Sequence, residues 1–349
     1  MKIIKTGIAS YGMSGRIFHG PSLKVLEDQF EVVGVFERTK KESEYLFPQA
    51  TIYRSFSELL ANPEIELVIV NTPDHLHYGM TKEALLAGKH VVTEKPFTLS
   101  VEEADELIEL AKKQNKVLSV YQNRRYDGNY KTVKKIIDQG LLGRLVELEI
   151  HYDRYRKEIR EGSWKEEGDD RVGVLFNLGA HLVDQVVQLV GMPEAVTAKL
   201  AKVRDRSVVN DYMNIRLDYP NLQVILRSSY LVKSPGPMYT LNGVEGSYLK
   251  FGGDPQEELL DKGQLPTGAD WGKEAEGNWG TLVTDINGVE YKGKIETEAG
   301  CYPDFYRDLF KCIVMRESNP VPGEQARETV RILNAAVESH LKEVTKKLT

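Results

Sequence analysis

The stretch Ser10-Tyr11-Gly12-Met13-Ser14-Gly15 follows a predicted strand at residues 3–9 and matches the pattern G-x-G-x-x-G, with serine in the first glycine position. In dinucleotide-binding turns the middle glycine lets the backbone approach a pyrophosphate, and the last lets the helix pack closely against the strand. The first helical N–H groups then face the phosphates. An incomplete motif is also compatible with a tight turn that binds no nucleotide. Its position between a strand and a helix favours a nucleotide site.

The first third of the chain alternates short apolar strands with helices. Strands are predicted at residues 3–9, 31–36, 67–71, 90–93 and 117–120, and helices at 56–61, 78–87 and 101–114. Short apolar strands are typical of a parallel sheet that is covered on both faces. The last of these helices begins with Ser100-x-x-Glu103, a capping-box pattern. The alternation predicts an α/β fold with a doubly wound parallel sheet in residues 1–122.

Residues 123–349 show a different pattern, and we expect them to form a second domain. After a helix at 128–139, longer strands with alternating polarity are predicted at 145–156, 195–204, 211–218, 223–230, 238–241, 247–251 and 281–289. Asn242-Gly243 and Asn287-Gly288 are typical of hairpin turns. Helices follow at 303–316 and 323–346, and residues 254–280 are predicted as a surface loop. The pattern predicts an α+β domain with a large, mainly antiparallel open sheet.

Composition limits the classes of protein to which the chain can belong. Its 349 residues are more than a single core usually supports, which agrees with two domains. The formal net charge of −6 argues against a general nucleic-acid-binding protein, which normally presents a basic face. The chain has no apolar run of about 18 residues, and it starts with a polar-flanked strand instead of a signal peptide. We therefore expect a cytoplasmic protein with no membrane contact.

Glu37, Arg38 and Thr39 end the second predicted strand, about 20 residues after the glycines, where such folds select the ribose of the cofactor. Glu37 could accept hydrogen bonds from the 2′- and 3′-hydroxyls, which favours NAD. Arg38 could bind a 2′-phosphate or stack on adenine, which allows NADP. A solvated pair of charges at a strand end is the alternative. The sequence predicts NAD or NADP as cofactor, with a slight preference for NAD.

Asn71, Thr72 and Pro73 follow the third predicted strand, and His77 comes four residues later. We expect this turn to line the ribose and the nicotinamide of the cofactor. His75 and His77 could suggest a metal site, but no third ligand or cysteine cluster accompanies them. No metal site is predicted.

Residues 87–97, Ala-Gly-Lys-His-Val-Val-Thr-Glu-Lys-Pro-Phe, place Lys95 between a carboxylate and a proline directly after a predicted strand. Pro96 restricts the backbone of Lys95 and so presents its ammonium group from a stiffened strand end. Ligands of open α/β sheets bind outside the carboxyl ends of the strands, which puts Lys95 where a substrate would lie. A surface Glu-Lys pair is the alternative. We expect Glu94 to orient Lys95 or to contact the nicotinamide region.

Three motifs together resemble those of the glucose–fructose oxidoreductase/inositol dehydrogenase (Gfo/Idh/MocA) family: Tyr11-Gly12-x-x-Gly15, Thr72-Pro73-x-x-x-His77 and Ala87-Gly88-Lys89-His90-Val91-x-x-Glu94-Lys95-Pro96. The similarity continues through residues 118–127, 152–156, 177–185 and 254–272, and so spans nearly the whole chain. The second half is most similar to the branch of NADP-dependent scyllo-inositol dehydrogenases. The resemblance implies an N-terminal Rossmann domain and a C-terminal α/β domain whose open sheet supports homo-oligomers, either dimers or tetramers.

The resemblance also implies hydride transfer between NAD(P) and a secondary hydroxyl of a sugar, polyol or cyclitol. The catalytic lysine of the family corresponds to Lys95 and its histidine to His181. The family's aspartate is replaced here by Asn177, which is a third candidate for the catalytic site. Asn123 is a further candidate for cofactor binding. Polyols need hydrogen-bond donors and flat apolar surfaces, and the candidates for the substrate wall are Tyr152, Arg154, Tyr155 and Trp164.

Oxidation of an alcohol needs a base for the hydroxyl proton, and histidine is the natural base near neutral pH. Asn177, His181 and Asp184 are spaced i, i+4 and i+7, which would put them on one face of a helix. A structural histidine in an apolar helix is the alternative. Lys95 would stabilise the alkoxide. Asn177 could hold His181, Lys95 or a substrate hydroxyl by hydrogen bonds.

Two other functions stay open at this point. The same site could use NAD transiently, oxidising a sugar to permit glycosidic elimination with no net production of NADH. The replacements at Ser10 and Asn177 could instead mark a nucleotide-binding sensor without activity, although Lys95 and His181 argue against it. The cysteine ligands of a zinc alcohol dehydrogenase are missing, since Cys301 and Cys312 are the only cysteines.

Overall fold

The computed structural model describes residues 2–167 and 172–348, and the chain divides into two compact units. The first unit consists of Met1–Asp127, Pro255–Gly272 and Gly300–Arg327, and the second of Gly128–Asp254, Lys273–Ala299 and Glu328–Thr349. Each unit is therefore built from three separate stretches of chain, whereas the sequence suggested one boundary after residue 122.

The first unit contains a six-stranded sheet in the order β3-β2-β1-β4-β5-β6, with every neighbouring pair parallel. Its strands are β1 (Ile4–Ile8), β2 (Phe30–Phe36), β3 (Thr51–Tyr53), β4 (Leu67–Val70), β5 (His90–Glu94) and β6 (Leu118–Tyr121). The predicted doubly wound sheet is confirmed. The strand order reverses between β1 and β4, and such a reversal marks the ligand-binding edge of an open sheet. The edge strand β3 was not predicted, because its three residues are exposed or half-buried.

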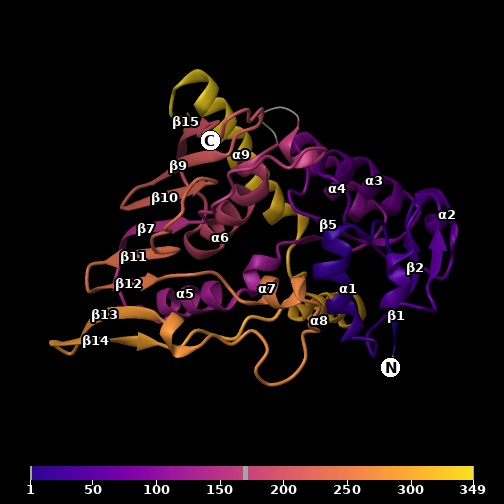
Figure 1. The fold of residues 1–349 in the computed structure, drawn as a ribbon, viewed down its shortest axis with the longest axis horizontal. Helices are drawn as coiled ribbons and strands as arrows, with labels where there is room; N and C mark the ends of the chain where they lie inside the picture. Colours follow the sequence, from indigo (N-terminus) through magenta and orange to yellow (C-terminus); the bar gives the residue numbers. More distant parts are fainter. Residues whose placement is uncertain (1, 168–171, 349) are drawn as a thin grey trace. The chain divides into compact units, whose positions relative to one another are not determined.

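The helices of the first unit pack against this sheet, and Figure 1 shows α3 and α4 as neighbours beside β5. They are α1 (Gly20–Lys24), α2 (Phe56–Ala61), α3 (His77–Leu86), α4 (Val101–Lys113), α7 (Gln256–Asp261) and α8 (Pro303–Phe310), with π-helical turns at Gly15–His19 and Lys311–Met315 and 3-10 turns at Glu42–Tyr45, Asp74–Leu76 and Asn123–Tyr126. The predicted cap of α4 is half formed. Ser100 accepts a hydrogen bond from the Glu103 backbone N–H, but the Glu103 carboxylate accepts one from Leu99.

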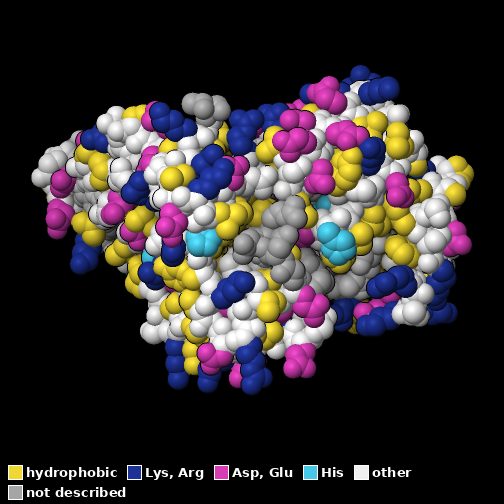
Figure 2. All heavy atoms as spheres, turned by 90° about the horizontal axis from the view of Figure 1, so that it is seen from above, with side chains coloured by type: hydrophobic (Ala, Val, Ile, Leu, Met, Phe, Trp, Pro, Cys, Tyr) yellow, Lys and Arg dark blue, Asp and Glu magenta, His cyan; other side chains and the backbone are white. Residues whose placement is uncertain are grey.

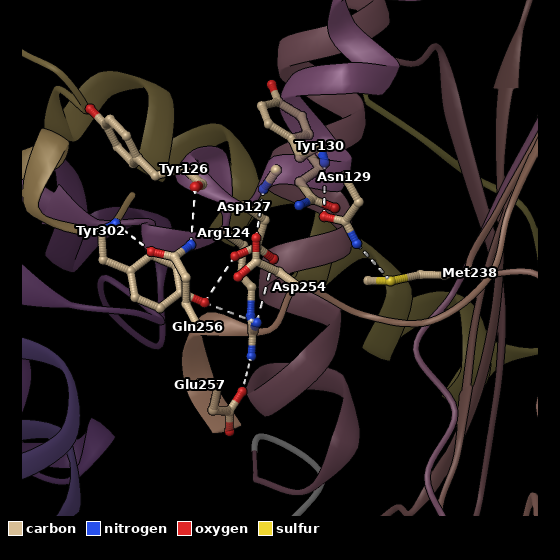
Figure 3. A network of polar contacts seen from close by, with 12 residues as sticks. Arg124, Tyr126, Asp127, Asn129, Tyr130, Met238, Asp254, Gln256, Glu257 and Tyr302 are labelled. Atoms are coloured by element: carbon tan, nitrogen blue, oxygen red, sulfur yellow. Dashed lines mark hydrogen bonds and ion pairs between the residues drawn. The ribbon is translucent and has the colours of Figure 1, made fainter. Parts of the chain in front are cut away.

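Residues 254–280 are not simply a loop, because they contain α7, which packs against the turn Gly15–His19. Gln256 fixes this helix from a fully buried position. Its amide nitrogen donates to the Tyr126 carbonyl, and its amide oxygen accepts a hydrogen bond from the Tyr302 backbone N–H (Figure 3). The sequence did not reveal α7, because the helix has six residues and lies among glycine, proline and charged residues.

The second unit contains a nine-stranded sheet in the order β14-β13-β12-β11-β7-β10-β9-β8-β15. Its strands are β7 (Leu145–His151), β8 (Ala195–Ala201), β9 (Tyr212–Tyr219), β10 (Leu222–Ser229), β11 (Tyr239–Gly243), β12 (Gly246–Lys250), β13 (Gly280–Ile286), β14 (Val289–Ile295) and β15 (Lys346–Lys347). Only β7 and β10 pair in parallel, so the prediction of a large, mainly antiparallel sheet is confirmed. Its helical segments are α5 (Gly128–Asp138), α6 (Ala180–Val190), most of α9 (Gly323–Lys342), a π-helical turn at Leu175–Gly179 and 3-10 turns at Trp164–Glu166 and Glu276–Asn278.

The two predicted hairpin turns had different outcomes. Asn287 and Gly288 form the turn between β13 and β14, with φ values of 55° and 80°. The strand β14 itself was not predicted. Asn242 and Gly243 lie within β11 instead of in a turn. Glycine is required at position 243 because a Cβ there would approach the Leu142 carbonyl oxygen to 2.0 Å.

Burial alternates along the central strands of the nine-stranded sheet. In β10, Val224 and Leu226 are fully buried. Gln223, the residue before Val224, is exposed. The turn before α6 packs on β9 and β10, and α6 contacts α5 (Figure 1). These helical segments therefore cover one face of the sheet, as is common for antiparallel sheets.

Charged side chains of both signs are intermingled on the face that Figure 2 draws. This mixture agrees with the modest net charge of −6. Within residues 2–167 and 172–348, no helix has the length and apolar character that a membrane span requires.

Candidate functional site

The turn after β1 has the close packing that a dinucleotide-binding turn needs. A Cβ at Gly15 would lie 2.6 Å from the Ser10 carbonyl oxygen, so glycine is required there. A Cβ at Gly12 would meet only the Ser10 hydroxyl, at 3.7 Å, which leaves open space beside the backbone. Met13 is exposed, and the chain then enters the π-helical turn Gly15–His19. Such turns are frequent at functional sites.

Three buried polar atoms near the ends of β1 and β4 have no hydrogen-bond partner in the part of the chain that the structure describes: the Tyr11 hydroxyl, Asn71 Oδ1 and Thr72 Oγ1. Burial raises the pKa of Tyr11, so its hydroxyl remains a donor. Asn71 also holds the glycine turn, because its Nδ2 donates to the Ser10 carbonyl at 2.7 Å. Buried polar atoms without partners are costly. A bound nucleotide would supply the missing partners.

His77 braces two turns at this edge of the sheet. Its ring is fully buried, with one nitrogen 2.7 Å from the Pro96 carbonyl oxygen and the other 2.9 Å from that of Thr72. Both ring nitrogens thus face backbone carbonyl oxygens, next to Pro73 on one side and Lys95 on the other, and whichever nitrogen carries the proton donates to its carbonyl. The structure gives His77 a bracing role, where the sequence suggested a direct cofactor contact.

Glu37 follows β2 and is buried, and its carboxylate closes the loop after the strand. Its Oε1 accepts a hydrogen bond from the Glu42 backbone N–H at 2.9 Å. Its Oε2 accepts two from Ser43, one from the backbone N–H at 3.3 Å and one from the hydroxyl at 2.6 Å. Arg54 ties the same loop by donating to the carbonyls of Glu37 and Lys40. Glu37 therefore anchors its own loop, whereas the sequence suggested a contact with ribose.

The loop held by the Glu37 carboxylate contains four consecutive exposed residues, Arg38, Thr39, Lys40 and Lys41. Lys40 pairs with Glu42 at 2.7 Å. The Arg38 guanidinium has no ion-pair partner among the described side chains. A guanidinium at this position can bind a phosphate group with two parallel hydrogen bonds.

Glu94 ends β5, and half-buried Lys95 follows it. Glu94 Oε1 accepts a hydrogen bond from the Ser14 hydroxyl at 2.8 Å and lies 3.1 Å from His19 Nε2. Its Oε2 accepts one from the Lys95 backbone N–H at 3.1 Å. Burial opposes the charge on Glu94, but the hydrogen bond with His19, the charge of Lys95 and the Ser14 hydroxyl together lower the pKa of Glu94 below its ordinary value. Glu94 stays ionised at neutral pH and is too weak a base to take a substrate proton.

Sequence reasoning missed the group behind Glu94. His19 is fully buried and its Nδ1 lies 2.5 Å from the hydroxyl of Tyr306, 287 residues away. The Tyr121 ring packs 4.3 Å from the His19 ring, centroid to centroid. A single histidine after the glycine turn carries no recognisable pattern, and no local signal relates it to Tyr306.

Asn123 is buried in the 3-10 turn after β6. Its neighbour Arg124, also missed from sequence, is buried in a charge network (Figure 3). The guanidinium donates to Asp127 at 3.4 Å, to the Tyr302 hydroxyl at 3.2 Å and to Glu257. Tyr302 in turn donates to Asp127 at 2.9 Å. The network fixes the turn that carries Asn123 to α7 and to the start of residues 300–327.

In the second unit, Asn177 and His181 lie in consecutive helical segments instead of one regular helix. Asn177 is half-buried in the π-helical turn Leu175–Gly179, and His181 is buried in the first turn of α6. The Asn177 amide donates to the Tyr230 hydroxyl at 3.2 Å. Asp184, one turn further along α6, is also buried.

Tyr230 connects Asn177 to a buried arginine that the sequence did not single out. The Arg204 guanidinium lies 5.0 Å from the centre of the Tyr230 ring. Its Nε donates to Asp211 at 2.8 Å, and another nitrogen donates to Glu166 at 2.6 Å. Paired burial of these charges makes the surroundings of Asn177 rigid.

The candidates for the substrate wall follow β7 in the second unit. The Arg154 guanidinium lies over the Tyr152 ring at 5.3 Å from its centre. Tyr155 is exposed, with the Lys233 ammonium 5.8 Å from its ring centre. Trp164 begins a 3-10 turn, and its side chain lies outside the described part of the structure. No group of three or more His, Cys, Asp or Glu residues is placed to hold a metal among the side chains described.

Both halves of the chain match one oxidoreductase family. Residues 4–122 match the NAD-binding Rossmann fold of GFO_IDH_MocA, and residues 134–347 match the C-terminal alpha/beta domain. The scyllo-inositol 2-dehydrogenase (NADP(+)) IolW of Bacillus subtilis is 39% identical over 337 residues, which cover 96% of this chain and 93% of that protein. The solved structure of Bacillus subtilis yvaA is 37% identical, with a TM-score of 0.96 over 100% of both chains. That of a Bacteroides fragilis protein is 43% identical, with a TM-score of 0.91 over 99% of this chain and 100% of the other. The chain belongs to the Gfo/Idh/MocA family and is an NAD(P)-dependent dehydrogenase that acts on CH–OH groups.

Proposed function

We propose that the protein transfers hydride between NADP and a secondary hydroxyl of a cyclitol, polyol or sugar. The observation that carries this proposal is the end of β5, where Ser14 and His19 hold Glu94 as an anion and Lys95 follows it. The similarity to an NADP-dependent scyllo-inositol dehydrogenase supports a cyclitol as the substrate.

The preference for NADP rests on the loop after β2. Glu37 already accepts three hydrogen bonds from its own loop, so its carboxylate has little capacity left for ribose hydroxyls. Exposed Arg38 is suited to the 2′-phosphate of NADP. The glycine turn at residues 10–15 would hold the pyrophosphate, and Tyr11, Asn71 and Thr72 would pair their buried polar atoms with the cofactor.

When bound, the cofactor accepts or returns a hydride at C4 of the nicotinamide. His181 takes the hydroxyl proton from the alcohol and gives it back in the reverse direction. Lys95 stabilises the negative charge that develops on the alcohol oxygen, an effect of about 3–4 kcal/mol for a well-placed donor. Asn177, positioned by the Tyr230 hydroxyl, orients His181 or a substrate hydroxyl without adding a charge.

The substrate would lie against Tyr152, Arg154, Tyr155 and Trp164. Of these, Arg154 is half-buried over the Tyr152 ring and can donate to ring hydroxyls. The stacking stiffens the guanidinium, which lowers the entropy lost when it binds a substrate.

We also propose that the chain forms a dimer or tetramer through the open face of the nine-stranded sheet. The strand register places Ile225, Glu149, Thr240, Leu249 and Thr281 in one row across five strands, on the face opposite the buried side chains. This row mixes apolar and polar side chains, a composition that suits an interface between copies.

The proposed activity is tested by adding scyllo-inositol, myo-inositol and a set of aldoses to the protein with NADP⁺ or NAD⁺ and following nicotinamide reduction. We expect reduction with at least one cyclitol or polyol and a higher kcat/KM with NADP⁺ than with NAD⁺. Lys95→Ala serves as the matched control, because it should bind NADPH but turn over roughly 10²–10⁴-fold more slowly. Tight NADPH binding without turnover on any polyol, or release of an aglycone from a glycoside with no net NADPH, would contradict the proposal.

A further inference from the structure

The first unit contains a buried chain of polar contacts that begins at Tyr306, passes through His19 and ends at Glu94. His19 is fully buried, with Nε2 3.1 Å from Glu94 Oε1 and Nδ1 2.5 Å from the Tyr306 hydroxyl. Both ring nitrogens therefore have defined partners. The proposed chemistry uses none of the atoms of His19 or Tyr306.

The protons in this chain can be placed from the surroundings of Tyr306. Burial, together with the nearby Tyr121 and the Glu94 carboxylate, raises the pKa of Tyr306 well above its ordinary value. The phenol therefore stays protonated and donates to His19 Nδ1. His19 Nε2 then carries the other proton and donates to Glu94, which is ionised. One tautomer of the ring satisfies every group in the chain.

The orientation of the His19 ring is fixed by aromatic packing. Tyr121 lies 4.3 Å from it, centroid to centroid, and Tyr306 meets it edge-on at 6.2 Å. Phe305 packs edge-on against both tyrosines, at 4.9 Å from Tyr121 and 5.3 Å from Tyr306. The ring cannot turn away from Glu94 without disturbing this cluster.

Glu94 in turn hydrogen-bonds to two segments at the ligand-binding edge. Its Oε1 accepts a hydrogen bond from Ser14 in the glycine turn at 2.8 Å, and its Oε2 accepts one from the Lys95 backbone N–H at 3.1 Å. We propose that His19, supported by Tyr306, is a positioning residue that orients Glu94 and thereby holds the glycine turn and Lys95 in register for hydride transfer. The inference rests on the proposed function and extends it to residues that contact neither cofactor nor substrate.

Two substitutions of His19 distinguish a positioning role from a role in core packing alone. Glutamine can place its amide nitrogen where Nε2 lies and keep the hydrogen bond to Glu94. Asparagine can reach only the position of Nδ1 and loses that bond. Both substitutions remove the aromatic ring, so a purely structural role predicts similar losses from both.

The test compares His19→Gln with His19→Asn in the full chain, measuring thermal midpoint, NADPH Kd by fluorescence, and kcat and KM for the polyol. We expect both variants to lose thermal stability to a similar extent. His19→Asn should lower kcat about 10- to 100-fold and raise the NADPH Kd about 3- to 10-fold, as loss of such outer contacts does elsewhere. His19→Gln should stay within about 3-fold of the parent in both. Equal kcat and Kd in the two variants would overturn the proposal.

Tyr306→Phe keeps the aromatic packing and removes the donor to His19, and it should lower kcat while leaving KM for the polyol nearly unchanged. Phe310→Leu is the control, because Phe310 packs on Phe30 and should affect thermal stability alone. A double-mutant cycle of His19→Asn with Glu94→Ala should show that the His19 effect on NADPH Kd vanishes once the acceptor for Nε2 is gone. Additive effects would overturn the proposal. Because NADPH binding needs no polyol, failure of the proposed activity remains distinguishable from failure of the positioning role.

Discussion

Glu94 and Lys95 are adjacent in the chain, but we assign them different roles in the site. The Glu94 carboxylate is held by Ser14 and His19, so Lys95 supplies the charge that a developing alkoxide would meet. We expect Lys95→Ala to lower kcat by roughly 10²–10⁴-fold and to change the NADPH Kd by less than about 3-fold. Steady-state kinetics and fluorescence titration measure the two effects. Equal turnover in variant and parent, with binding intact, would remove Lys95 from the chemistry.

Asn177 stands where the resemblance to the family implies an aspartate. Replacement by aspartate would keep the contact with the Tyr230 hydroxyl, since a carboxylate accepts the hydrogen bond that the phenol can donate. It would also add a negative charge one helical turn from His181, which favours the protonated imidazole and raises its pKa. The acidic limb of kcat/KM for oxidation should therefore move upward, by up to about one pH unit. A limb that stays in place would mean that His181 is not the titrating base.

Substitutions of Arg38 and Glu37 should affect cofactor choice differently. Arg38→Ala should lower kcat/KM for NADP by about 10- to 100-fold and leave that for NAD nearly unchanged, because the guanidinium is expected to meet only the 2′-phosphate. Glu37→Gln should weaken both cofactors alike, because the carboxylate orders the loop through Ser43 and Glu42. Lys41→Ala is the control for general loss of positive charge. An unchanged NADP/NAD ratio in Arg38→Ala would show that the ribose is recognised elsewhere.

At the level of elements, the start of β5 depends on a neutral histidine. The Nδ1 atom of His90 accepts a hydrogen bond from the Val117 backbone N–H at 2.9 Å, just before β6. Burial, then the charges of Lys116 and Lys2, lower the pKa of His90 to about 4, although Glu66 opposes the shift. The unfolded chain binds this proton near pH 6.5, and the folded chain only near pH 4. The contribution of His90 to stability is therefore complete above pH 6.5 and is lost as the pH falls towards 4.

We expect the parent to lose about 1–2 kcal/mol between pH 7.5 and 5 on account of this half-buried ring. His90→Asn retains an acceptor for Val117 but does not titrate, so its free energy of unfolding should fall less over the same interval. Urea unfolding at the two pH values gives the comparison. An identical loss in parent and variant would mean that His90 does not control the acid stability of β5.

At the scale of the whole molecule, the proposed association through the open sheet face predicts a change of mass on substitution. Leu249→Asp puts a negative charge at an apolar position of the row and should convert the dimer or tetramer to a smaller species, measured by light scattering after gel filtration. Leu86→Asp, at an exposed position of α3, is the matched control and should leave the mass unchanged. A parent that is already monomeric would contradict the proposal.

The sequence did not show which stretches of chain belong to which unit. Gln256 and Arg124 anchor residues 255–272 and 300–302 to the turn after β6 within the first unit. The contacts to Arg124 and Tyr126 link positions at least 130 residues apart, and no sequence periodicity indicates them. The sequence therefore suggested one boundary where each unit draws on three segments.

Local patterns were sufficient for strands β1, β2, β4, β5 and β6 and helices α2, α3, α4 and α8 of the first unit, for the glycine turn, and for the position of Lys95 at the end of β5. Each is encoded within a few neighbouring residues, because hydrophobic period, capping and glycine conformation act over one or two turns of chain. Only the tertiary structure decided that β3 pairs with β2 and that β14 pairs with β13. The same holds for the contacts of Glu37 with its own loop and of His19 with Tyr306. A buried polar side chain must find a hydrogen-bond partner in the folded chain, and for His19 that partner lies on a distant segment.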